Sequence, residues 1–117
     1  ASVIILNFTL QFIEPKLRDN LLIKLASALI PGGILILSEK VKFDDKEVND
    51  LLIDVYHAFK KANGYSDLEI SQKRTALENV LKPETIEAHL NRLLSAGFKT
   101  AEVWFQCFNF TSMIAIK

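Results

Sequence analysis

Two short apolar runs near the start of the chain limit its fold more than any other feature. Residues 3–8 begin with Val-Ile-Ile-Leu, and residues 34–37 are Ile-Leu-Ile-Leu. Such continuous runs are typical of strands in parallel sheets that are covered on both faces. Residues 16–30 between them carry leucines at helical spacing, and Pro31-Gly32-Gly33 would end that helix. The order strand, helix, strand predicts a βαβ unit with parallel strands.

The middle of the chain predicts three further helices. Asp44 and Asp45 are candidate caps of a helix that closes at Asn63-Gly64. Residues 66–69 match the S-x-x-E capping box and open a second helix, and Pro83 marks the start of a third. None of these segments contains a repeat or a linker.

The end of the chain predicts a hairpin. Residues 102–108 and 112–116 are mostly apolar or aromatic, and the short link 109–111 separates them. The predicted fold class is therefore α/β: a mixed sheet with helices on its faces and a terminal antiparallel hairpin.

Length and composition exclude several classes of protein. A chain of 117 residues suits one domain, and 50% hydrophobic residues predict a packed core instead of disorder. The net charge of zero argues against a general nucleic-acid binder. Residues 21–37 are interrupted by Lys24 and Pro31-Gly32-Gly33, so we expect no membrane span. A single cysteine and the lack of a secretion signal favour the cytoplasm.

The first strand needs neighbours on both sides, and nothing before it supplies one. The chain also lacks an initiating Met. We therefore expect residues 1–117 to be one domain that is the C-terminal part of a longer one.

Candidate ligand residues lie where the parallel strands end, because open α/β sheets bind ligands beyond that edge. Asn7 closes the first strand, and Ser38-Glu39-Lys40 follow the second. The side-chain amide of Asn7 could recognise polar atoms of a ligand, or Asn7 could simply turn the chain. Its position alone does not separate the two interpretations.

Arg74 is the most informative single residue. It lies between Ile70 and Leu77 on the same face of its predicted helix. An arginine aimed into apolar surroundings needs an anion, ideally a carboxylate that it binds with both nitrogens. Alternatively, its stem lies on the core and its head reaches solvent.

Other reactive residue types form no recognisable site. His57 and His89 fit no metal-ligand spacing, so we interpret both as structural and expect no metal. Cys107 lies in an aromatic-rich strand and is interpreted as a core residue, not a nucleophile. The aromatic residues Trp104, Phe105, Phe108 and Phe110 are interpreted as core or interface residues, since no basic residues alternate with them in the sequence. No G-x-S-x-G or G-x-G-x-x-G motif is present, and we assign no catalytic residue.

Five blocks of the sequence resemble one known family. They are LNFTLQF (6–12), LSEK (37–40), FKKANGYS (59–66), LEISQKR (68–74) and WFQCFNF (104–110). The chain is similar over essentially its whole length to the carboxy-S-adenosyl-L-methionine synthases, a branch of the class I S-adenosylmethionine (SAM)-dependent methyltransferases. The resemblance implies the C-terminal part of that Rossmann-like fold.

The resemblance also implies a reaction. The family converts SAM and prephenate to carboxy-S-adenosylmethionine and phenylpyruvate, for modification of the wobble uridine in tRNA. The SAM methyl group loses a proton and captures carbon dioxide from prephenate. Asn7 matches the family residue that contacts the adenosyl ligand, and Arg74 matches the one that binds the added carboxylate. The resemblance further implies a homodimer. From the net charge and the interrupted apolar stretch we expect no direct binding of nucleic acid and no membrane association.

The family's glycine-rich loop would precede Ala1, so we expect this chain alone not to bind SAM tightly. Two alternatives to the synthase stay open. An ordinary SAM-dependent methyltransferase is favoured if Arg74 is exposed and no carboxylate pocket faces it. A non-catalytic assembly module is favoured if the chain folds stably without an adenosyl site.

Overall fold

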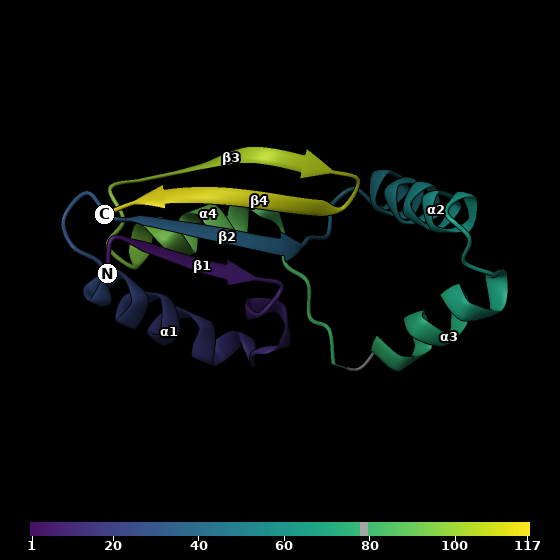
Figure 1. The fold of residues 1–117 in the computed structure, drawn as a ribbon, viewed down its shortest axis with the longest axis horizontal. Coiled ribbons are helices and arrows are strands. Elements are labelled where there is room, and N and C mark those ends of the chain that lie inside the picture. Colours follow the sequence, from purple (N-terminus) through teal and green to yellow (C-terminus); the bar gives the residue numbers. More distant parts are fainter. Residues whose placement is uncertain (78–79) are drawn as a thin grey trace.

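The computed structural model describes residues 1–77 and 80–117. Figure 1 shows the strands as one layer, with α1 and α4 beside it and α2 and α3 extending from one end. The elements are β1 (Val3–Asn7), a 3-10 turn (Leu10–Phe12), α1 (Pro15–Ala28), β2 (Ile34–Lys40), α2 (Lys46–Ala62), α3 (Asp67–Leu77), α4 (Ile86–Ser95), β3 (Thr100–Cys107) and β4 (Phe110–Ile116).

The sheet has the strand order β1-β2-β4-β3. β1 and β2 pair in parallel, with Asn7 opposite Ser38, so the carboxyl ends of the two strands meet at one edge. β4 pairs antiparallel with both β2 and β3. The βαβ unit, the mixed sheet and the terminal hairpin predicted from the sequence are thus confirmed.

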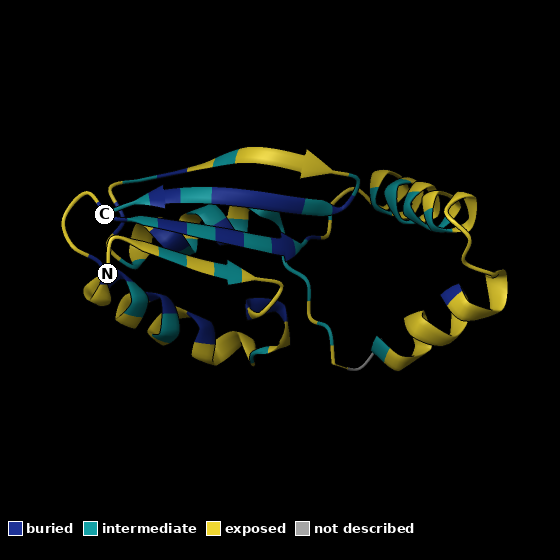
Figure 2. Cartoon of the chain, viewed as in Figure 1, coloured by how far each residue is buried: buried dark blue, intermediate teal, exposed yellow. Residues whose placement is uncertain are grey.

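The core lies on one face of this sheet. Leu35 and Leu37 of β2 are fully buried against Leu22 of α1 and Leu93 of α4. Alternate residues of the same strands point to the other face, which no described helix covers. There Val3, Ile5 and Trp104 are each more than half exposed. Figure 2 shows much of the edge strands β1 and β3 in the colour of exposed residues. The expectation of a sheet covered on both faces is therefore wrong for the described chain.

The helical pair α2–α3 projects beyond the sheet. The radius of gyration is 15.5 Å, against about 13 Å for a compact chain of this length. α2 has no buried residue. Its apolar residues at helical spacing form an exposed stripe, Val48, Leu51, Val55 and Phe59.

Local signals in the sequence set most element ends. The Asp45 carboxylate accepts a hydrogen bond from the Val48 N–H, and the Ser66 hydroxyl accepts one from the Glu69 N–H. Thr85, not Pro83, caps α4. The predicted link 109–111 is wrong: β3 runs to Cys107 and β4 begins at Phe110, which leaves a two-residue turn.

None of the helices in the described part of the chain is long and apolar enough to cross a membrane.

Candidate functional site

A cavity of about 510 Å³ opens at the carboxyl end of β2. Its walls come from the end of β2, from α2 and α3, from the segment before α4 and from the hairpin turn. The residues that line it are Lys40, Val41, Lys42, Asn49, Ile53, Ser71, Arg74, Thr75, Leu77, Leu81, Pro83 and Asn109. The position agrees with the general rule that open α/β sheets bind ligands beyond the carboxyl ends of their strands.

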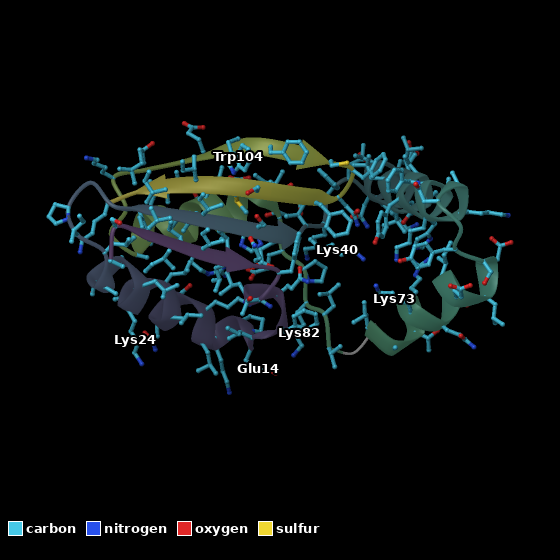
Figure 3. All side chains as sticks on the ribbon, in the orientation of Figure 1. Glu14, Lys24, Lys40, Lys73, Lys82 and Trp104 are labelled. Atoms are coloured by element: carbon cyan, nitrogen blue, oxygen red, sulfur yellow. The ribbon has the colours of Figure 1, made fainter. Side chains whose placement is uncertain are left out.

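Three cationic side chains line this cavity: Lys40, Lys42 and Arg74. Within residues 1–77 and 80–117, neither Lys40 nor Arg74 takes part in an ion pair. Burial lowers the pKa of the Lys40 ammonium, and the positive charges of Lys60, Arg74 and Lys73 lower it further. Figure 3 labels Lys40 at the end of β2 and Lys73 on α3. An excess of positive charge in a neutral chain makes the cavity suited to an anion.

The hairpin turn adds an unsatisfied amide to the cavity. Asn109 is 2% exposed, and its side-chain oxygen has no hydrogen-bond partner among the described residues. A buried polar atom without a partner is costly, so a ligand that supplies a hydrogen bond there would be stabilised.

Aromatic rings lie beside the cations. The Lys40 Nζ is 5.5 Å from the ring centre of Tyr56 and 6.0 Å from that of Phe110, and the Lys60 Nζ is 4.6 Å from Tyr56. These distances suit cation–π contacts. No basic residue alternates with the C-terminal aromatics in the sequence, but the fold brings lysines of β2 and α2 to Phe110 and Tyr56.

Asn7 lies at the same edge of the sheet but does not line the cavity. It is exposed, and its carbonyl accepts a 2.9 Å hydrogen bond from the Thr9 hydroxyl. Phe8 follows with a φ of 50° and donates its N–H to the Ser38 carbonyl. The two predicted ligand residues, Asn7 and Arg74, are thus not brought into one cavity within the described structure. Arg74 is exposed, although Ile70 of the same face is buried.

The sequence did not predict a buried network of charged side chains that connects β2, α1 and α4. Arg18 and Glu39 are both fully buried. Arg18 pairs with Glu84, and Arg92 donates a 2.7 Å hydrogen bond to the other Glu84 oxygen. Burial acts to raise the pKa of Glu84, but the hydrogen bonds from Arg92 and Arg18 outweigh it and lower the pKa. The spacing of Arg18 and Leu22 on α1 already placed this arginine on the core face.

Two side chains near this network, Glu39 and His89, have strongly shifted pKa values. Burial raises the pKa of Glu39 from 4.5 to about 7, although hydrogen bonds from the Gln11 and Leu10 N–H groups oppose the change. Burial lowers the pKa of His89 from 6.5 to about 4. The structure therefore favours an uncharged imidazole at His89.

No protein-family model matches the sequence. Curated relatives match it along all 117 residues: the carboxy-S-adenosyl-L-methionine synthases of Aliivibrio fischeri, Photobacterium profundum and Pasteurella multocida, at 63%, 62% and 61% identity. The chain is homologous to these synthases. It spans about half of their length, 48% in each case.

Solved structures agree on the fold of this synthase homologue. PigF with SAH superposes with a TM-score of 0.65 at 19% identity, covering 99% of this chain and 30% of PigF. Human N-acetylserotonin methyltransferase in complex with SAM gives 0.65 at 16%, covering 100% of this chain and 29% of the human enzyme. At these identities the likeness concerns the fold alone: the chain has part of a class I SAM-dependent methyltransferase fold.

The structure changes the interpretation of Cys107. Cys107 is exposed, so its interpretation as a core residue is wrong. The edge strand β3 has no neighbour on its outer side among the described residues, and Trp104 and Phe105 beside Cys107 are also exposed.

The two histidines lie in different surroundings: His89 is buried and His57 is half-buried. The described residues contain no group of three His, Cys, Asp or Glu side chains that could hold a metal ion.

Proposed function

We propose that this chain is part of a carboxy-S-adenosyl-L-methionine synthase, which makes carboxy-S-adenosylmethionine and phenylpyruvate from SAM and prephenate. The names of its relatives support the activity. The observation that carries the proposal is the cavity lined by Lys40 and Arg74, which have no ion-pair partner among residues 1–77 and 80–117, because a carboxylated ligand would supply an anion there.

Arg74 would hold the carboxylate of the ligand through its guanidinium, and Asn7 would contact the adenosyl part. Both act by binding, and neither needs to exchange a proton. SAM carries only the carboxylate of its methionine part, so the ligand of an ordinary methyltransferase lacks the second carboxylate that Arg74 would hold. Although the Arg74 side chain is exposed, it borders a cavity that two lysines also line, which favours the synthase over that alternative.

The proposal includes a larger domain and a homodimer. The free edge of β1 and the apolar sheet face around Ile5 support a domain that extends beyond residues 1–117. The exposed stripe that contains Leu51 and Val55 supports α2 as the contact between two copies. We place the enzyme in the cytoplasm, where its product would serve tRNA wobble-uridine modification. Its zero net charge supports a role without direct nucleic-acid or membrane binding.

The test is the affinity of Arg74→Ala for two ligands, measured by calorimetry on the full-length protein that contains this chain. The matched control is Lys73→Ala, which removes a neighbouring positive charge of α3 that does not line the cavity. We expect Arg74→Ala to lose about 1.5 kcal/mol or more of binding to carboxy-S-adenosylmethionine, roughly the value of one hydrogen bond to a charged group. Binding of SAM should change less. Equal losses for both ligands, or no loss for either, would refute the role of Arg74.

A further inference from the structure

The Glu39 carboxylate joins the carboxyl ends of the two parallel strands. Glu39 lies near the end of β2 and is fully buried. Its two oxygens accept hydrogen bonds from consecutive N–H groups of the turn after β1, at 3.0 Å from Leu10 and 3.2 Å from Gln11. A buried carboxylate that binds two neighbouring N–H groups fixes the backbone that carries them.

The turn after β1 also accepts a hydrogen bond from the end of β2. The side-chain oxygen of Gln11, which is 7% exposed, accepts a 2.9 Å hydrogen bond from the Lys40 N–H. The turn is also held from the α1 side, because Arg18 donates to the Gln11 carbonyl at 3.1 Å and to the Lys82 carbonyl at 3.0 Å. The turn after β1 is therefore tied to Lys40 on one side of the cavity and to the segment next to Pro83 on another.

We propose that Glu39 is a positioning residue for the ligand site, which holds the turn after β1 against the end of β2 and so fixes Asn7 relative to the cavity of Lys40 and Arg74. This inference rests on the proposed function, since it assigns Asn7 and the cavity to parts of one ligand. It explains how Asn7 and the cavity, which are not in contact, stay at a constant distance from each other.

Only the ionised carboxylate can hold the turn fully. Two acceptor oxygens serve two N–H groups, whereas a protonated carboxyl or a glutamine amide offers one good acceptor. The charged groups around Glu39 are Arg18 on α1 and Glu84 before α4, and His89 and Arg92 on α4 lie in the same network. Burial raises the pKa of Glu39 to about 7, so the ionised form predominates above neutral pH.

The test compares SAM affinity at pH 6 and pH 8 in the full-length protein, by calorimetry, for wild type, Glu39→Gln and the control Glu47→Gln, an exposed carboxylate on α2. At pH 8 we expect Glu39→Gln to bind SAM about tenfold more weakly, the factor for one hydrogen bond to a charged acceptor. At pH 6 the two proteins should differ much less, because wild-type Glu39 is then protonated. Glu47→Gln should follow wild type at both pH values.

A second variant covers the case in which Glu39→Gln does not fold. Gln11→Leu removes the bond to the Lys40 N–H but leaves Glu39, so we expect weaker SAM binding that keeps the wild-type pH dependence. SAM binding by Glu39→Gln, or by folded Gln11→Leu, equal to that of wild type at pH 8 would overturn this inference alone. Wild-type protein that binds no SAM at either pH would overturn the proposed function, and the inference with it.

Discussion

Glu39 and His89 make opposite contributions to the pH dependence of stability. Burial raises the pKa of Glu39 from 4.5 to about 7, and burial lowers the pKa of His89 from 6.5 to about 4. Both side chains are almost completely inaccessible to solvent, so neither shift is screened by water. Folding therefore takes up a proton at Glu39 and releases one at His89 over much of the same pH range.

The signs follow from which state binds the proton. The protonation of Glu39 stabilises the fold fully below pH 4.5, and this contribution is lost as the pH rises through about 7. The neutral state of His89 stabilises the fold fully above pH 6.5, and this contribution is lost as the pH falls through about 4. Where one group titrates alone, the free energy of unfolding changes by about 1.4 kcal/mol per pH unit.

We predict that the two slopes cancel in the wild-type protein between about pH 5 and pH 6.5. Glu39→Gln removes the opposing carboxyl group, so its free energy of unfolding should rise by about 2 kcal/mol over that interval. Burial also lowers the pKa of the half-buried His57, which acts in the same direction as His89. His89→Met removes the buried imidazole, so its free energy of unfolding should fall by up to about 2 kcal/mol, less the opposing contribution of His57. Each substitution also changes the free energy of unfolding by an amount that does not depend on pH, and this change leaves the slope against pH unaffected.

Urea unfolding followed by far-ultraviolet circular dichroism at four pH values in this interval measures the slopes. Glu47→Gln serves as the control, because the carboxylate that it removes is exposed and the slope should stay near zero. A flat profile for Glu39→Gln, or a wild-type profile as steep as that of either variant, would show that these groups do not titrate as their burial requires.

Two further predictions concern packing. Leu22→Ala on α1 should lower the free energy of unfolding by about 2–5 kcal/mol, whereas Leu17→Ala on the same helix, at a side chain that is 52% exposed, should change it little in urea unfolding. Leu51→Glu places a charge on the exposed stripe of α2. It should shift the full-length protein from dimer to monomer in sedimentation velocity, and an unchanged dimer would exclude this face as the contact.

The sequence predicts the βαβ unit because its signals are local. Leucines at helical spacing, the Pro31-Gly32-Gly33 turn and two apolar runs each act over a few residues, and the structure confirms all of them. The placement of β4 between β2 and β3 depends on pairing over long sequence distances, for which no local pattern exists. The same limit explains Cys107: strand alternation does not reveal that β3 lies at an edge of the sheet.

Arg18 and Arg74 show why a candidate site is harder to predict than a fold. Both lie among apolar residues at helical spacing, so the sequence argument for an anionic partner applies equally to each. Arg18 is fully buried because the chain itself supplies that partner, Glu84, from 66 residues away. Arg74 has no such carboxylate among the described residues and lines the cavity with its guanidinium unpaired. The spacing identifies an arginine that needs an anion, but only the tertiary structure separates a structural arginine from one that is available to a ligand.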